Sequence, residues 1–338
     1  MRNINASRFF IVLLLLGWFG CSRPQQDTTV YANSCADDTS EDSDSLAPRR
    51  DNNYNQVRGA LLGTRFSSFE ELISVIEIEY LNDNAEHDST IHKNAKVFIR
   101  HCSNGRGVIS VLESGVSQGD IVEAKDGGFS DRLSIVFQSP YAVSNRKDLE
   151  RVFLLARLRP MLFGEGDVAF FTLAQSSVRN INTTALAFVN SRDTTEKGYL
   201  NTFNHITAQA FITSCFSEEL ADFVADAHER YHHPQLILGK FTEREINDLE
   251  EGPVDNYVDI INNEWGQELG KQLKAKYAIT RKTWWTPELL ANYLNDLQHY
   301  YSWSFQIGFK PFKAEDEAVI KFSRKLNAVL NTKSFGKY

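Results

Sequence analysis

The C-terminal half of this 338-residue chain has apolar residues at the spacing of α-helices. From about residue 147 onward, apolar residues recur every three or four positions, which places them on one face of an α-helix. Thr286-Pro287 is a typical helix start, and Pro234 should end the helix before it, since proline lacks the amide donor. This pattern predicts helices over residues 148–159, 167–178, 184–190, 199–216, 218–232, 254–277, 287–307 and 315–331.

Residues 56–145 carry mixed signals. The pattern over residues 69–80 indicates an amphipathic helix, and three apolar runs separated by glycine-rich turns indicate strands at 96–100, 108–112 and 133–137. We therefore predict a mainly α fold: a C-terminal helical bundle over residues 146–338, preceded by a smaller N-terminal α+β segment over residues 56–145.

The N-terminus has the features of an export signal. Two arginines precede an apolar run over residues 9–20 that is too short to cross a bilayer and that ends at Gly20-Cys21. A small residue before such a cysteine resembles a bacterial lipoprotein signal. That resemblance implies cleavage of residues 1–21, a lipid on Cys21 and, because Ser22 follows the cysteine, sorting to the outer membrane.

The match to that family is incomplete. Trp18 and Phe19 stand where the family has a leucine and a small residue, so an ordinary secretory signal or an uncleaved anchor are the alternatives. We expect an exported bacterial envelope protein, lipid-anchored to the membrane, facing the periplasm or the cell surface.

Residues 22–55 are polar, include an acidic run and have almost no apolar side chains, which predicts a disordered tether. The net charge of −8 argues against a nucleic-acid partner or an anionic surface. Among the cysteines, we expect Cys35, Cys102 and Cys215 to be unpaired, with a disulfide between Cys35 and Cys102 as the alternative.

One short motif has the residues of a metal-binding site. His228-Glu229-x-x-His232 places two imidazoles on one face of a helix, where they can share a metal ion, and a glutamate beside the first can polarise a metal-bound water. Arg230 and the nearby Pro234 are unusual in such a site, because the proline stops the helix within a turn of His232.

Polar residues also occupy positions on the inner faces of three neighbouring helices. His205 lies among apolar residues of its helix, and His228 shares a face with small residues that should turn inward. On the third helix a single stripe carries polar residues and two glycines, which suggest close approach of another backbone. The stripe consists of Asp259, Asn262, Asn263, Gly266 and Gly270. Short connections should bring His205 and His228 within reach of each other.

The order of these residues resembles an uncharacterised bacterial helical domain found in secreted proteins, lipoproteins and toxin-like modules. The resemblance covers roughly residues 199–270. It implies one shared site but no particular reaction, and it does not require His232. The implied site residues are His205, Asp226, His228, Glu229, Asp259, Asn262 and Asn263.

Three functions are consistent with these residues and stand as hypotheses. The first is a hydrolase-like site in which His205 and His228 are ligands of a divalent metal such as zinc or act as bases, and Glu229 handles the proton. Asp226 or Asp259 would orient a histidine or join the metal shell, with His205, His228 and Asp259 as the expected ligand set. Asn262 or Asn263 would stabilise developing charge. The second is a zinc metallopeptidase with His228 and His232 as ligands, Glu229 as general base and Glu264 as third ligand. The third is a non-catalytic binding or scaffold module with a structural polar interior.

Overall fold

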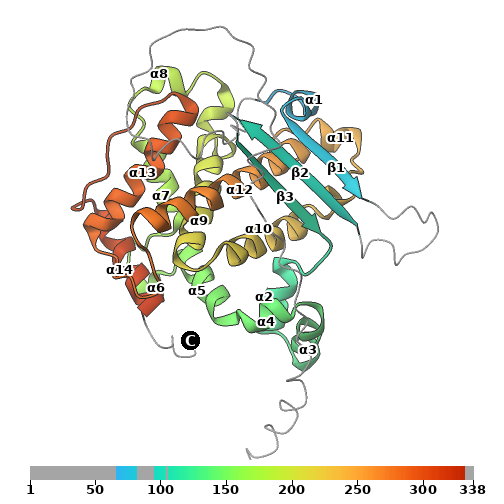
Figure 1. Cartoon of the computed structure of the whole chain (residues 1–338), viewed down its shortest axis with the longest axis horizontal. Coiled ribbons are helices and arrows are strands. Elements are labelled where there is room, and N and C mark those ends of the chain that lie inside the picture. Colours follow the sequence, from blue (N-terminus) through green and yellow to red (C-terminus); the bar gives the residue numbers. More distant parts are fainter. Residues whose placement is uncertain (1–65, 82–94, 104–105, 332–338) are drawn as a thin grey trace, which may run out of the picture. The chain divides into compact units, whose positions relative to one another are not determined.

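A computed structural model describes residues 66–81, 95–103 and 106–331, which all belong to one compact unit, Tyr31–Tyr338. The fold is mainly helical, as predicted, with one small antiparallel sheet near the start of the described part (Figure 1). No helix within the described ranges is both long and apolar enough to cross a membrane.

The sheet has three strands in the order β1-β2-β3. In the register, Ile78 of β1 faces Ile99 of β2, which in turn faces Ser110 of β3. Alternate residues of β2 point to the core, among them Val97, Ile99 and His101. The strands are β1 (Ile76–Leu81), β2 (Lys96–Ser103) and β3 (Arg106–Glu113).

Helices make up most of the remaining chain. In chain order the helical elements are α1 (Phe69–Ile73), α2 (Gln118–Asp126), α3 (Phe129–Gln138), α4 (Pro140–Ser144), α5 (Arg146–Ala156), α6 (Pro160–Phe163), α7 (Phe170–Arg179), α8 (Thr184–Ala187), η3 (Ser191–Thr194), η4 (Glu196–Leu200), α9 (Asn201–Cys215), α10 (Glu218–His232), η5 (Pro234–Ile237), α11 (Glu243–Ile246), α12 (Pro253–Lys276), α13 (Pro287–Phe305) and α14 (Glu317–Asn331).

Two predicted elements in the N-terminal segment are wrong. The predicted helix over residues 69–80 ends at Ile73, and Ile76–Leu81 is strand β1, because Ile-Glu-Ile-Glu-Tyr-Leu alternates with the period of a strand. The predicted strand over residues 133–137 belongs to helix α3. The Asp131 carboxylate accepts from the Gly128 amide at 2.6 Å and so caps the start of that helix.

The predicted ends of the later helices agree well with the structure. Helix α10 ends at His232, just before Pro234, and α13 begins at Pro287 with the Thr286 hydroxyl accepting from the Leu289 amide at 3.2 Å. Cys215 is free and buried, as predicted. Cys102 is disulfide-bonded, so the expectation that it is unpaired is wrong, and its partner lies outside the described residues.

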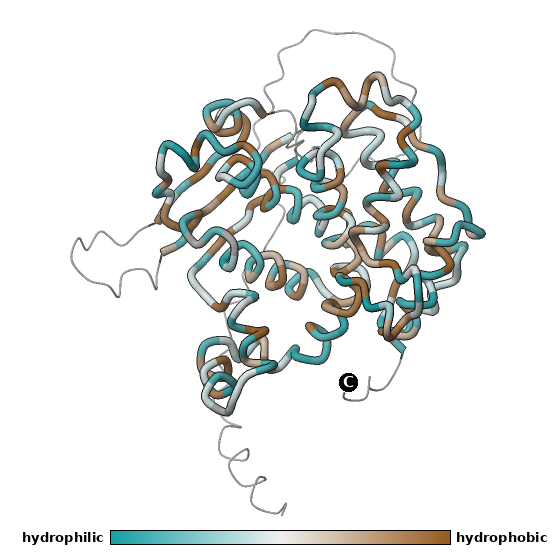
Figure 2. Tube along the Cα trace, turned by 180° about the vertical axis from the view of Figure 1, so that it is seen from behind, coloured by the Kyte–Doolittle hydropathy of each residue, from teal (hydrophilic) through white to brown (hydrophobic). Residues whose placement is uncertain are grey.

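Helix α12 is the centre of the fold. It packs against α9 and α10 on one side and against β2 and β3 on the other. The Trp265 indole donates to His101 Nδ1 at 2.9 Å, which ties this helix to the sheet. Hydrophobic stretches, brown in Figure 2, run along the strands and through the helices. One continuous core contains Val97 of the sheet and Phe322 of α14, so it spans the change of pattern at residue 145.

Two glycines let α9 and α12 approach closely, as predicted. A Cβ added at Gly266 would lie 2.8 Å from Gln209 Cβ and 3.0 Å from Ile206 Cα. One added at Gly270 would lie 2.7 Å from the Ala210 carbonyl oxygen. Only glycine fits at this spacing, so these two positions set the distance between the helices.

Candidate functional site

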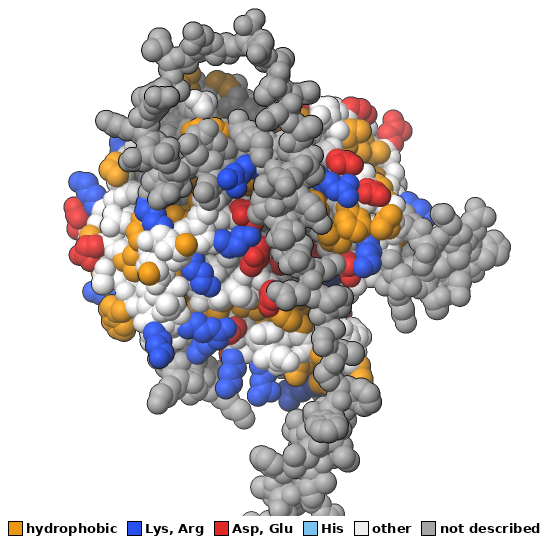
Figure 3. All heavy atoms as spheres, in the orientation of Figure 1, with side chains coloured by type: hydrophobic (Ala, Val, Ile, Leu, Met, Phe, Trp, Pro, Cys, Tyr) orange, Lys and Arg blue, Asp and Glu red, His pale blue; other side chains and the backbone are white. Residues whose placement is uncertain are grey.

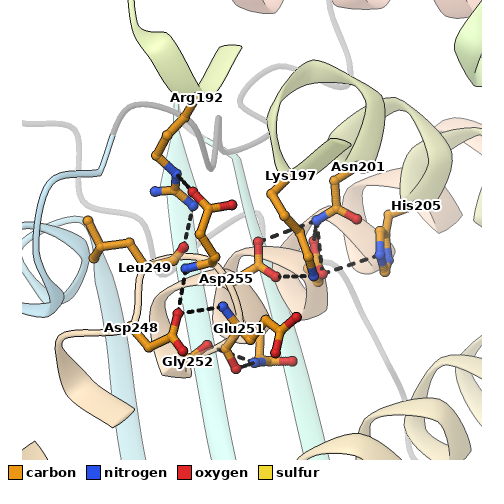
Figure 4. Close-up of polar contacts among 12 residues, drawn as sticks. Arg192, Lys197, Asn201, His205, Asp248, Leu249, Glu251, Gly252 and Asp255 are labelled. Atoms are coloured by element: carbon orange, nitrogen blue, oxygen red, sulfur yellow. Dashed lines mark hydrogen bonds and ion pairs between the residues drawn. The ribbon is translucent and has the colours of Figure 1, made fainter. Parts of the chain in front are cut away.

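A ladder of polar side chains joins the start of α9 to the start of α12. Lys197 of η4, and Asn201 and His205 of α9, follow one another at intervals of four residues and project in the same direction (Figure 4). Opposite them on α12 stand Asp255, Asp259 and Asn263, also four residues apart. The spacing of four places Asn201 and His205 on one side of α9, and the three residues of α12 on one side of that helix.

Direct polar contacts join the two sets of side chains. Lys197 Nζ lies 3.0 Å from Asp255 Oδ2. The Asn201 amide donates to both oxygens of Asp259, at 2.9 and 3.2 Å, and more weakly to Asp255 Oδ1 at 3.4 Å. Because one amide reaches both, the two aspartates lie close together.

His205 closes the ladder with both ring nitrogens engaged. Its Nε2 lies 3.3 Å from Asp259 Oδ2 and its Nδ1 lies 3.0 Å from Asn263 Oδ1. The His205 side chain is 14% exposed. A histidine held in this way has no free ring nitrogen to offer a metal ion, so its role here is to position Asp259.

Glu229 approaches the ladder from α10. It is only 3% exposed, and no hydrogen bond joins its carboxyl to any described residue. Burial raises the pKa of Glu229 well above its ordinary value, and the carboxylates of Asp259, Asp226 and Asp255 raise it further, while Lys197 opposes them. Burial and the charges of these carboxylates therefore favour the neutral form of Glu229 more strongly than in an ordinary glutamate.

Asp255 has the second perturbed carboxyl. Burial and the neighbouring Asp259 raise the pKa of Asp255 to about 7, against the pull of Lys197. Two carboxyls that accept from one amide repel each other when both are charged, so the pair holds its first proton near neutral pH. Acids with displaced pKa values are the groups that catalytic sites use.

Asp226, three residues before Glu229 on α10, belongs to a neighbouring contact. Its Oδ2 accepts from Arg230 at 2.6 Å, and the same guanidinium donates to the Glu113 carbonyl oxygen at 2.6 Å. Burial, and next Asp222, raise the pKa of Asp226. Arg230, which is unusual in a zinc site, thus ties α10 to β3.

The prediction that His228 turns inward is wrong. Helix α10 buries Ala221, Ala225 and Glu229, whereas His228 lies one residue, about 100°, away from Glu229 and is exposed. Its Nδ1 lies 3.0 Å from Gln118 Oε1 of α2. The structure therefore does not bring His205 and His228 together.

The first predicted set of metal ligands does not come together among the described residues. Within the described ranges, no group of three or more His, Cys, Asp and Glu residues could hold a metal ion. The set of His205, His228 and Asp259 is therefore not assembled. In the alternative set, the side chain of His232 lies outside the described part, and Glu264 is buried beside Ser110 of β3, with its pKa raised by burial.

Asn262 shares the polar stripe but not the ladder. It is fully buried, and neither its amide nitrogen nor its oxygen has a partner among the described residues. It lies one residue before Asn263, which faces His205, so the helix rotation separates the two amides.

Sequence reasoning missed Lys197, Asn201 and Asp255. Asn201 lies four residues before His205, Lys197 lies eight residues before it, and Asp255 lies four residues before Asp259. That spacing was the signal that could have found them.

Comparison with known proteins gives no family. No family model matches the chain, and neither a curated protein nor a solved structure matches it. The resemblance to the uncharacterised helical domain stays a prediction, and the site is interpreted from its own geometry.

Proposed function

We propose that this chain is an exported bacterial envelope protein whose helical domain is a hydrolase-like acid–base site at Glu229, Asp255 and Asp259. The observation that supports it is the Glu229 carboxyl, which is buried and has its pKa raised by burial and by the charges of two paired aspartates. Buried ionisable groups are costly to keep, and a neutral acid beside a carboxylate is the pair that hydrolysis needs.

In this proposal each residue has one task. Glu229 gives its proton to the leaving group as the scissile bond breaks, and Asp259 accepts a proton from the attacking water. Asp255 shares the proton of the pair. His205 and Asn201 position Asp259, and Lys197 balances the negative charge of the site.

The charge of Glu229 can be tested without a substrate. In the infrared difference spectrum of wild type minus Glu229→Gln at pH 7, we expect the carbonyl stretch of a neutral carboxylic acid. Because a neutral glutamic acid and glutamine have nearly the same shape and charge, the variant should keep the melting temperature of wild type. A carboxylate signal in place of the neutral acid would refute the proposal.

Catalysis needs a second experiment. Wild type and Glu229→Gln are assayed on ester, glycoside, phosphodiester and peptide substrates over a range of pH. On any substrate that is hydrolysed we expect a loss of about 100-fold or more in kcat/KM. Glu219→Gln is the matched control, because Glu219 lies on the same helix but is exposed. A metal chelator in the same assay tests the zinc peptidase.

The non-catalytic module remains the second candidate because His205 and Lys197 are both engaged within the ladder. In that case the ladder only fixes the register of α9 on α12. Glu229→Gln would then leave every hydrolytic rate unchanged.

The anchor is part of the proposal. Lipidation at Cys21 would hold the protein in the membrane fraction of an expressing bacterium, and Cys21→Ser would release it. Mass spectrometry of the N-terminal peptide distinguishes a lipidated cysteine from an ordinary cleaved signal or an uncleaved anchor.

A further inference from the structure

Three cations converge on one aromatic ring far from the polar ladder in sequence. Lys125 Nζ at the end of α2 lies 4.9 Å from the centre of the Phe153 ring of α5. The guanidinium carbons of Arg157 and Arg159 lie 5.0 and 4.7 Å from the same centre. Like charges repel, so this arrangement concentrates positive potential at one place.

The three cations have no acidic partner in the described part of the chain. No ion pair joins Lys125, Arg157 or Arg159 to a described carboxylate. Asp167 accepts from the Arg159 backbone amide at 2.6 Å, but its side-chain charge is paired with Lys325 at 2.8 Å. The guanidinium and ammonium groups are therefore available to an external anion.

Exposed apolar side chains lie next to these cations in sequence. Met161 is 96% exposed, Leu158 is 56% exposed and Leu162 is 37% exposed. Exposed hydrophobic side chains in a cluster mark an interaction surface. We call this set the basic–apolar patch: Lys125, Arg157, Leu158, Arg159, Met161 and Leu162. Figure 3 shows lysine and arginine side chains gathered along the lower edge of that view, where Figure 1 places α4 and α5.

The segment that carries the patch is held firmly. Lys325 of α14 is buried, and its Nζ donates to the Arg157 and Val168 carbonyl oxygens, each at 2.9 Å, besides pairing with Asp167. These contacts fix both ends of the stretch from Arg157 to Val168. The exposed side chains are thus presented by a fixed backbone, which lowers the entropy lost on binding.

We propose that the basic–apolar patch docks the protein on an anionic lipid bilayer. Lipid phosphates match the three unpaired cations, and the acyl region matches Met161, Leu158 and Leu162, which flank them in sequence. The net charge of −8 argued against an anionic surface, but docking depends on the local charge of the face that meets it. The proposal is independent of the ladder and of the N-terminal anchor.

Vesicle flotation tests the proposal with the chain from Tyr31, which contains the whole compact unit and omits the apolar N-terminal run. Binding is measured on vesicles of phosphatidylcholine alone and of phosphatidylcholine mixed with phosphatidylglycerol. We expect partitioning onto the anionic vesicles only. A cation near an anionic surface contributes about 1 kcal/mol, so R157Q/R159Q should lower the partition coefficient about 25-fold.

Two further variants separate the contributions. Met161→Asp should reduce partitioning about 10-fold or more, because it replaces an inserted side chain by a charge. K240Q/K310Q changes net charge equally at exposed sites outside the patch and should stay within about two-fold of wild type. Circular dichroism confirms that each variant is folded.

Three results would overturn the proposal. They are equal binding to neutral and anionic vesicles, anionic binding that R157Q/R159Q leaves unchanged, and binding of inorganic phosphate or soluble glycerophosphate without binding of vesicles. The last would show a site for a small anion in place of a docking surface.

Discussion

Gly270→Ala should destabilise this protein, although alanine is the better helix former. In an exposed helix interior the change would stabilise by about 1 kcal/mol. Here the new Cβ would lie 2.7 Å from the Ala210 carbonyl oxygen, 3.0 Å from Ala210 Cα and 2.8 Å from Thr213 Cβ. Two of these three atoms are backbone atoms of α9, which cannot rotate away, so α9 and α12 must separate.

Forced overpacking of this kind costs about 3 kcal/mol at the upper end of its usual range. After subtracting the gain in helix propensity, we expect the free energy of unfolding to fall by about 2 kcal/mol, with a melting temperature roughly 4–8 °C lower. Urea denaturation followed by far-UV circular dichroism measures the change, provided that the transition has a single step.

Ala275→Gly is the control that measures the effect of helix propensity alone, because Ala275 is an exposed residue of the same helix. It should cost about 1 kcal/mol with no effect on packing. If Gly270→Ala is as stable as wild type or more stable, α9 and α12 do not approach as closely as these distances require, and the argument from the glycines is wrong.

For three other perturbations, the direction of the change in the free energy of unfolding follows from the structure. Lys325→Met should lower the free energy of unfolding by about 3–5 kcal/mol in chemical denaturation, because it leaves Asp167 buried without its ion-pair partner. Lys321→Met is the control on the same helix: its ion pair is exposed, so the change should cost under about 1 kcal/mol. Burial and a neighbouring carboxylate raise the pKa of Asp255 from 3.8 to about 7, so the folded state binds a proton that the unfolded state has lost. The free energy of unfolding should therefore fall by up to about 4 kcal/mol as the pH rises from 3.8 to about 7. In Asp255→Asn, the denaturation midpoint should no longer fall with pH over this range. Burial lowers the pKa of His101 from 6.5 to about 4, so the free energy of unfolding should fall as the pH falls from 6.5 to about 4. His101→Gln should show no such loss in the same titration.

Local patterns were enough to predict the helices of the C-terminal half, because their start and stop signals are residues within the element itself. Pro234 and Thr286 act on the backbone of their own turns. The N-terminal segment was harder. The apolar run over residues 133–137 suits a strand as well as a helix, and the cap at Asp131 decides between them.

The site was predictable only in part, since its contacts join residues far apart in the chain. His205, Glu229, Asp259 and Asn263 were found because polar residues on inner helix faces are unusual. The direction of His228 was not, because Ala221 and Ala225 lie on a face that either His228 or Glu229 could extend. Burying Glu229 lets the exposed imidazole reach Gln118, a partner 110 residues away.

The glycines and the ladder depend on each other. Gly266 and Gly270 bring α12 against α9, and the acidic residues of α12 lie about two to four turns before them on the same helix. Close approach at the glycines is therefore what allows contacts of 2.9 to 3.3 Å between Asn201 or His205 and Asp259. A scaffold needs only such a satisfied ladder. Glu229 is not required by it, since no hydrogen bond joins its carboxyl to a described residue, and its burial costs free energy that packing alone would avoid by using an apolar side chain. This unexplained cost of burying Glu229 is the reason to look for chemistry there before any residue of the ladder.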